Sequence, residues 1–197
     1  MSMADTRSAL LIVDVQRDFC PGGALAAPEG DRVVQPLNRY IEQAAAHGWP
    51  VYASRDWHPQ VTRHFRPYGG EWPVHCVEHT RGAEFHPDLR LPPSAIVVSK
   101  GQSPEKPGYS AFEGHTPAGR TLADDLRARQ IDHLFVGGIA TDYCVKHSVL
   151  DARRAGLDVT VLADAIAGVD RQPGDSSGAL EEMRAAGAKV TESAGRP

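Results

Sequence analysis

An apolar strand gives way to a helix within one stretch of the sequence, Leu134-Phe135-Val136-Gly137-Gly138-Ile139-Ala140-Thr141-Asp142-Tyr143-Cys144-Val145. If Thr141 is the N-cap of that helix, Cys144 lies in the first turn, where unpaired backbone N–H groups and the helix dipole lower the pKa of a thiol. The position therefore favours a thiolate nucleophile. The alternative interpretation is a small buried residue that packs at a helix start.

Apolar runs of similar length recur along the chain and alternate with stretches of helical periodicity. The predicted strands cover residues 9–13, 51–53, 95–98, 134–136 and 159–162, with a weaker one at 188–191. The predicted helices cover residues 31–47, 118–130, 142–155 and 175–186. Because the strands are continuously apolar, both sheet faces are expected to be buried, which predicts an α/β fold with a parallel sheet between two helix layers. Ligands of such sheets bind beyond the carboxyl ends of the strands.

The composition restricts the classes of function. The chain has 197 residues, of which 41% are hydrophobic, and this predicts a single domain over residues 1–197. A net charge of −4, with both signs interspersed, argues against nucleic acid or a membrane as partner and favours a small molecule. Three cysteines and the lack of a charged-then-apolar leader do not suit a secreted disulfide framework, so we expect a cytoplasmic protein.

Two charged residues stand at the ends of predicted strands. Asp14 follows the first apolar run; burial there would raise its pKa and suit it to exchange a proton with a neighbouring thiol. Asp18, in the loop that follows, competes for that role, and Asp14 could instead cap a turn. Lys100 ends the third run, where it would stabilise a thiolate, a carboxylate and a developing oxyanion, although a surface lysine is the ordinary explanation.

A long connection at about residues 56–93 is rich in Pro, Gly, Arg and His and has no helical period, which indicates a functional loop. Asp56 and His58 begin it with the i, i+2 spacing of two metal ligands, and His64 and His75 follow. This set suits Zn²⁺ first, with Fe²⁺ or Mn²⁺ as alternatives. Spacing alone does not choose the ligands, because the same loop contains two further histidines, His79 and His86. The alternative interpretation is that these are solvated loop histidines without a metal. Two further cysteines are interpreted as packing residues, Cys20 and Cys76.

Taken together, five ordered blocks of this sequence resemble the isochorismatase-like cysteine hydrolases, and among them the nicotinamidases, also called pyrazinamidases. The blocks are Leu11-Ile12-Val13-Asp14-Val15-Gln16-Arg17-Asp18-Phe19-Cys20-Pro21-Gly22-Gly23-Ala24-Leu25, Asp56-Trp57-His58-Pro59, Trp72-Pro73-Val74-His75-Cys76, Lys100-Gly101 with Tyr109-Ser110-Ala111-Phe112, and Gly138-Ile139-Ala140-Thr141-Asp142-Tyr143-Cys144-Val145. The resemblance implies a three-layer α/β/α fold with a six-stranded parallel sheet.

The resemblance also implies roles for individual residues. The catalytic triad would be Asp14, Lys100 and Cys144. The metal ligands would be Asp56, His58 and His75, with His64 as a fourth. A cis peptide bond is expected between Ile139 and Ala140, and the N–H groups of Ala140 and Cys144 would form an oxyanion hole. The walls of an aromatic pocket would be Phe19, Trp72, Tyr109 and Ile139, for each of which ordinary packing is the alternative.

By this resemblance the expected reaction is hydrolysis of nicotinamide, and also of pyrazinamide, through a cysteine thioester, as in NAD salvage. The divalent ion would orient the pyridine nitrogen. The alternatives are a metal-free relative acting on another small amide or carbamoyl compound, a zinc hydrolase using metal-bound hydroxide, and a non-catalytic binding module. A homo-oligomer is also compatible with the resemblance.

Overall fold

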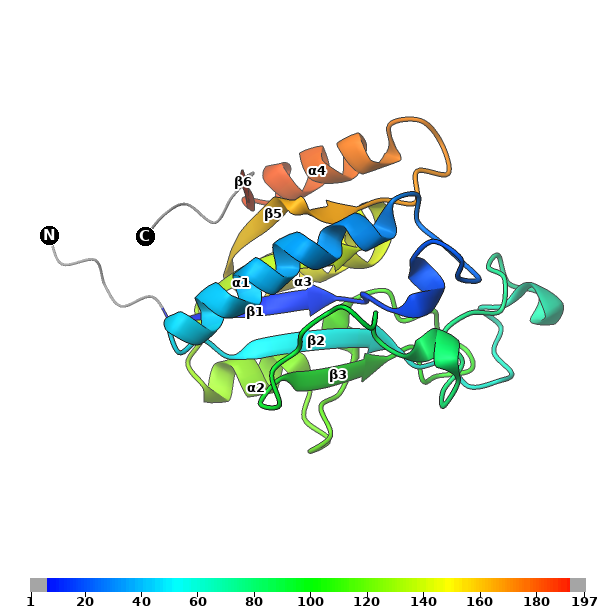
Figure 1. Ribbon diagram of the computed structural model, residues 1–197, viewed down its shortest axis with the longest axis horizontal. Coiled ribbons are helices and arrows are strands. Elements are labelled where there is room, and N and C mark those ends of the chain that lie inside the picture. Colours follow the sequence, from blue (N-terminus) through cyan, green and yellow to red (C-terminus); the bar gives the residue numbers. More distant parts are fainter. Residues whose placement is uncertain (1–6, 192–197) are drawn as a thin grey trace, which may run out of the picture.

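The structure, a computed structural model, describes residues 7–191 and contains a six-stranded parallel sheet in the order β3-β2-β1-β4-β5-β6 (Figure 1). The strands are β1 (Ser8–Val13), β2 (Val51–Asp56), β3 (Ile96–Lys100), β4 (His133–Ile139), β5 (Asp158–Ala167) and β6 (Lys189–Thr191). All five neighbouring pairs are parallel. The predicted six-stranded α/β/α fold is confirmed.

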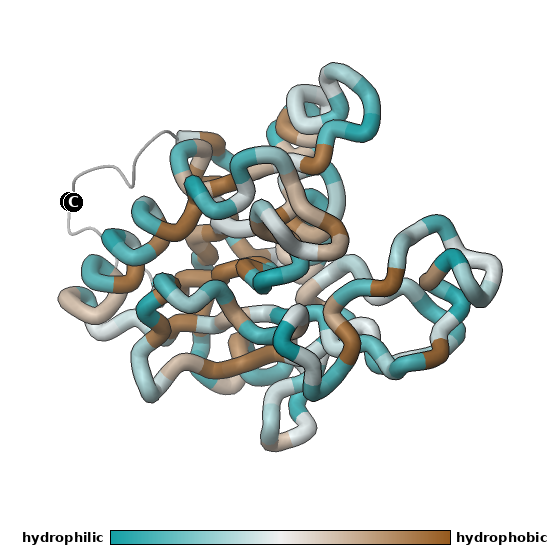
Figure 2. The backbone as a smooth tube through the Cα atoms, turned by 45° about the vertical axis from the view of Figure 1, so that its right-hand side comes forward, coloured by the Kyte–Doolittle hydropathy of each residue, from teal (hydrophilic) through white to brown (hydrophobic). Residues whose placement is uncertain are grey.

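Helices cover both faces of the sheet, as the continuous hydrophobicity of the strands predicts. They are α1 (Val34–Ala46), α2 (Leu122–Ala128), α3 (Lys146–Arg154) and α4 (Asp175–Ala185). Alternate residues of β1 enter two different core clusters: Leu11 packs with the buried residues of α2, α3 and α4, whereas Leu10 packs with those of α1. In Figure 2 the central strands carry much of the hydrophobic colour, while long stretches of the surrounding loops are hydrophilic. Within residues 7–191, no helix combines the length and apolar character needed to cross a bilayer.

Three predicted boundaries are corrected by the structure. Thr141 is not an N-cap: Ala140 holds that position, and the helix begins with a π-helical turn, Thr141–Val145, that leads into α3. The helix expected from residue 118 begins at Leu122, because Thr121 caps it by accepting a hydrogen bond from the Asp124 N–H. β5 extends to Ala167 because its pairing with β4 resumes beyond an irregularity between Val136 and Gly138.

The connection from β2 to β3 contains no helix longer than a single turn, as expected. Its short turns are Arg66–Tyr68 and Arg81–Ala83. In Figure 1 it projects beyond the carboxyl ends of β1, β2 and β3. The Trp57 N–H donates to the Lys100 carbonyl and the His58 N–H to the Cys76 carbonyl, so the start of the loop is fixed beside the sheet.

Candidate active site

Four neighbouring strands each deliver one ionisable side chain to the same edge of the sheet. In sheet order these are Lys100 at the end of β3, Asp56 at the end of β2, Asp14 just after β1 and Cys144 in the turn after β4. Asp56 and Lys100 are directly paired across the ladder. Because parallel strands end on one side, residues far apart in the sequence meet there.

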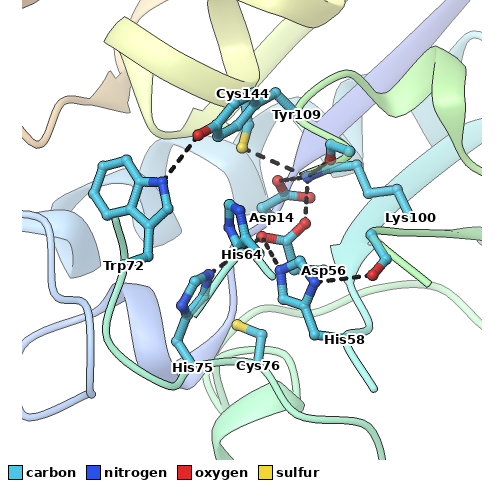
Figure 3. Close-up of polar contacts among 12 residues, drawn as sticks. Asp14, Asp56, His58, His64, Trp72, His75, Cys76, Lys100, Tyr109 and Cys144 are labelled. Carbon is cyan, nitrogen blue, oxygen red and sulfur yellow. Dashed lines mark hydrogen bonds and ion pairs between the residues drawn. The ribbon is translucent and has the colours of Figure 1, made fainter. Parts of the chain in front are cut away.

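Lys100 is the centre of this group (Figure 3). Its Nζ lies 2.7 Å from Asp14 Oδ2, 2.5 Å from Asp56 Oδ1 and 3.5 Å from Cys144 Sγ. It also donates to the Gly108 carbonyl at 3.1 Å. The lysine is only 1% exposed, so it is not the surface residue that the ordinary explanation requires. Asp14 is further held by the Ser54 hydroxyl, which donates to its Oδ1 at 2.7 Å.

Burial controls the protonation of this group. Burial raises the pKa of Asp14, although Lys100 opposes the shift. Burial would lower the pKa of Lys100, but Asp14 and Asp56 outweigh it and raise that pKa well above its usual value. Burial also raises the pKa of Cys144 well above that of a free thiol, and Lys100 only partly offsets it. The expectation that the helix start lowers this pKa is therefore wrong, because burial raises it.

Three histidines gather beside Asp56. One ring nitrogen from each of three histidines lies within 4.8 Å of the other two; these are His58, His64 and His75. Asp56 Oδ2 is 3.4 Å from His58 Nε2 and 3.9 Å from His75 Nε2, so the carboxylate stands between Lys100 and the imidazoles.

The histidine cluster has the chemistry of a metal site. His58 Nε2 is buried and has no hydrogen-bond partner among the described residues, whereas its Nδ1 contacts the Gly101 carbonyl at 2.9 Å. The Nδ1 of His75 contacts the Pro73 carbonyl at 2.7 Å. Such backbone contacts orient metal-binding imidazoles. Burial lowers the pKa of His75 and lowers that of His64 to about 3, which keeps both rings neutral, the form that binds a cation.

The other candidates from the loop lie elsewhere. His79 packs edge-on against Trp57, and His86 Nδ1 accepts a hydrogen bond from the Asp88 N–H. Asp18 accepts hydrogen bonds from the Cys76 and Ala24 N–H groups, which makes it an organiser of the loop and not a competitor of Asp14.

One supporting residue was not anticipated from the sequence. Gln16 is fully buried, and its side chain donates to the Asp56 and Ala83 carbonyls while accepting from the Asp56 N–H. It therefore joins the segment after β1 to the end of β2 and to the long loop. Its position two residues after Asp14 is the only signal of this role in the sequence.

Gly101 leaves room for His58, which gives a first prediction. Gly101 has a φ of +69°, and a Cβ added there would lie 2.5 Å from His58 Cε1 and 2.7 Å from its Nδ1. We expect Gly101→Ala to displace the imidazole and to weaken metal binding by about 10–100-fold, the usual effect of disturbing a residue that supports a ligand. Competition with a chromogenic chelator measures the affinity.

Gly119→Ala is the matched control. Gly119 has a similar φ of +75°, but a Cβ there would meet no atom within 4 Å. Both substitutions impose the same kind of backbone strain, on the order of 1 kcal/mol, and only Gly101→Ala adds a collision with a histidine. Equal metal affinities in the two variants would contradict the assignment.

A cavity opens onto the sulfur and the imidazoles and encloses about 360 Å³ of space between atoms, part of it open to solvent. Its lining is Phe19, Leu25, Asp56, His64, Trp72, His75, Tyr109, Ala140, Tyr143, Cys144 and Val169. The Trp72 Nε1–H donates to the Tyr109 hydroxyl at 2.9 Å, which fixes both rings in the wall. The aromatic rings of this lining suit a flat, single-ring ligand.

The lining differs from the expected set. Ile139 is not part of it; this side chain is buried in the core cluster that α1 covers, and its neighbour Ala140 faces the cavity instead. The expected cis peptide bond between Ile139 and Ala140 is present. Sequence reasoning did not assign three of the lining residues, namely Leu25, Tyr143 and Val169.

The fold and the site together define a hydrolase of the isochorismatase-like class. The chain belongs to this family, since residues 8–195 match the Isochorismatase domain. It is 45% identical to a nicotinamidase of Escherichia coli, over 92% of this chain and 93% of that protein. It is 42% identical to a nicotinamidase/pyrazinamidase of Mycobacterium tuberculosis, over 92% of this chain and 97% of that one.

The structural comparison agrees. The crystal structure of a pyrazinamidase of Pyrococcus horikoshii in complex with zinc superimposes with a TM-score of 0.87 at 44% identity, covering 94% of this chain and 98% of that one. The family resemblance inferred from the five sequence blocks is confirmed.

Proposed function

We propose that this protein is a nicotinamidase, a single-domain amidohydrolase that converts nicotinamide to nicotinate and ammonia and also accepts pyrazinamide. The observation that carries the proposal is the position of Cys144: its sulfur faces an aromatic cavity that also contains His64 and His75, and Lys100 lies behind it. The similarity to nicotinamidases along nearly the whole chain supports the same activity.

In the proposed mechanism, Asp14 removes the thiol proton and the sulfur attacks the carboxamide carbon. Asp14 suits this step because burial raises its pKa toward the range of a general base. The backbone N–H groups of Ala140 and Cys144 stabilise the oxyanion; removing one such donor typically costs about 3–4 kcal/mol in the transition state. The C–N bond then breaks, Asp14 returns the proton to the departing ammonia, and a thioester remains. Water, deprotonated by Asp14, hydrolyses the thioester to nicotinate and restores the thiol.

Lys100 keeps this chemistry electrostatically balanced. Its charge lies between two buried carboxylates, Asp14 and Asp56, and next to the sulfur that becomes anionic. A permanently protonated amine here stabilises the thiolate and the carboxylate without donating its own proton.

A divalent ion, Zn²⁺ first, is proposed at the histidine cluster. Asp56, His58, His64 and His75 would hold it, since their ligand atoms face one another and His58 Nε2 lacks another partner among the described residues. When bound, the ion supplies a Lewis acid that takes a pyridine nitrogen as a ligand and so orients the ring. The aromatic walls, chiefly Phe19, Trp72 and Tyr109, hold that ring while Cys144 meets the carboxamide.

The location of the protein follows the same proposal. All three cysteines are free and buried, as expected of a protein from a reducing compartment, which supports the cytoplasm. Assembly into a homo-oligomer and the lack of a nucleic-acid partner stay predictions.

An ammonia-release assay on nicotinamide, with and without prior treatment by a strong chelator, tests substrate and metal together. We expect steady ammonia release from the untreated protein, a large rise in KM after chelation, and recovery on addition of Zn²⁺. No release of ammonia from nicotinamide at any metal concentration would contradict the proposed substrate. Full activity in protein shown by elemental analysis to be metal-free would contradict the role of the ion.

A further inference from the structure

The segment that follows β5 is fastened to the helix that carries Cys144. Asp142, two residues before the cysteine, is 6% exposed and accepts two backbone hydrogen bonds. Its Oδ1 accepts the Val169 N–H at 3.0 Å, and its Oδ2 accepts the Asp170 N–H at 2.8 Å. Both carboxylate oxygens are therefore bonded to consecutive residues of a segment distant in the sequence.

The other end of this segment is fixed as well. The Asp170 carboxylate accepts hydrogen bonds from the Ser176 N–H and hydroxyl at the start of α4, both at 2.8 Å. A Cβ on Gly168 would lie 1.9 Å from Ser176 Oγ and 3.0 Å from Asp170 Oδ2, so a side chain there would have to displace the serine hydroxyl from Asp170. Val169 and Asp170 are thus bonded to Asp142, and the Asp170 side chain links them to the start of α4.

Val169 belongs to the cavity wall together with Tyr143 and Cys144, whereas Asp142 does not line the cavity and takes no part in the proposed mechanism. The backbone of Val169 is bonded directly to Asp142, so the distance of the valine from the nucleophile depends on this carboxylate. A carboxylate suits the task because it offers two acceptors to two N–H donors, which an amide side chain does not.

We propose that Asp142 is a positioning residue and Val169 a specificity-determining residue: Asp142 holds Val169 against the substrate ring, and the valine excludes carboxamides with a substituent on that side of the ring. This inference rests on the proposed hydrolysis of nicotinamide. It assigns the selection of unsubstituted rings to a residue that the triad and the metal site do not include.

The test compares kcat and KM for nicotinamide and for nicotinamides that carry one methyl group on each free ring carbon in turn. In Val169→Ala we expect the ratio of kcat/KM, methylated over unsubstituted, to rise about tenfold or more for at least one isomer, the usual effect of one methyl group in an apolar pocket. Val169→Ile should lower the same ratio. Val190→Ala, in β6 and outside the cavity lining, is the control and should leave it unchanged.

Asp142→Asn tests the positioning role with a side chain of the same shape. The amide places an NH₂ donor against one of the two N–H groups. We therefore expect the KM for nicotinamide to rise by a larger factor than kcat falls. The ratio of kcat/KM, methylated over unsubstituted, should rise for the same isomer as in Val169→Ala. Asp124→Asn, on the exposed side of α2, is the matched control.

The double variant separates positioning from a general structural effect. If Asp142 acts through Val169, adding Asp142→Asn to Val169→Ala changes the ratio by less than about twofold, whereas independent effects multiply. Two results would overturn the inference, provided that the wild type hydrolyses nicotinamide. The first is a ratio in Val169→Ala that stays within about twofold of the wild-type ratio for every isomer. The second is independent effects of the two substitutions in the double variant. Absence of that turnover would instead overturn the proposed function, and this inference with it.

Discussion

Cys144→Ala is expected to abolish nicotinamide hydrolysis and to leave the metal content unchanged. Loss of a nucleophile that acts as a unit with its base lowers kcat on the order of 10⁴–10⁶-fold. The sulfur lies 3.5 Å from Lys100, and it is not one of the proposed ligands, which are Asp56 and the three histidines. The substitution therefore removes the nucleophile without removing a proposed ligand. Ammonia release and elemental analysis of the same preparation measure both effects.

Cys20→Ala is the control for this experiment. Cys20 is also buried, and burial together with nearby Asp31 raises its pKa to about 11, but it does not line the cavity. We expect nearly full activity from it. Substantial amidase activity in Cys144→Ala would rule out the covalent mechanism and leave water as the direct nucleophile.

Lys100→Met is expected to lower both stability and activity severely. The substitution keeps an unbranched side chain, one atom shorter, but removes the charge between Asp14 and Asp56. Breaking a buried ion pair in this way costs about 3–5 kcal/mol. The rate should fall on the order of 10²–10³-fold, because the thiolate and the oxyanion lose a positive neighbour. Chemical denaturation and the ammonia assay measure the two losses.

The stability loss should depend on pH in a defined direction. Burial raises the pKa of Asp14, and the charge of Lys100 lowers it. Without Lys100, the pKa of Asp14 in the folded protein therefore rises further above its value in the unfolded chain. The folded variant then binds a proton more readily than the unfolded chain does. The difference in free energy of unfolding between wild type and variant therefore shrinks as the pH falls through the pKa of folded Asp14, and it grows as the pH rises. Lys146→Met, which removes a surface ion pair with Glu182, should cost no more than about 1 kcal/mol. A deficit in Lys100→Met as small as this, or one independent of pH, would contradict the buried network.

Much of the site follows from where charged residues stand in the sequence. Asp14 comes directly after an apolar run and Lys100 two residues after another. Parallel strands place such residues at one edge of the sheet, so their meeting was predictable without knowing the order of the strands. Asp56 was anticipated as a metal ligand from its i, i+2 spacing to His58 and from the family resemblance. Its second contact, with Lys100, depends on β2 lying next to β3, and a single sequence does not state which strands pair.

The errors have physical causes. The N-cap prediction for Thr141 assumed an α-helical start, whereas the chain makes a π-helical turn there. The predicted low thiol pKa weighed the helix N-terminus without the opposing effect of burial, which is the larger one in the folded protein. Val169 was missed because β5 continues five residues beyond its apolar run, from residue 162 to Ala167, and only then turns toward the cavity.

Without the family resemblance, the sequence pattern alone could not choose among the histidines. The loop contains more imidazoles than a metal ion needs, and their spacing does not rank them. The structure separates them because the Gly101 and Pro73 carbonyls orient His58 and His75, while His79 packs on Trp57. The contacts of His58 with Gly101 and of His79 with Trp57 join residues that are distant in the sequence, which no local pattern reveals.

The central claim is that the Cys144 sulfur forms a thioester with the carboxamide carbon, and hydroxylamine tests it most directly. Hydroxylamine is nearly as small as water and intercepts a thioester to give the hydroxamate. With nicotinamide as substrate, the account predicts both nicotinate and nicotinohydroxamate as products, in a hydroxamate-to-nicotinate ratio that rises in proportion to the hydroxylamine concentration. Cys144→Ala should yield neither product. Steady ammonia release with nicotinate as the sole product at every hydroxylamine concentration would contradict it.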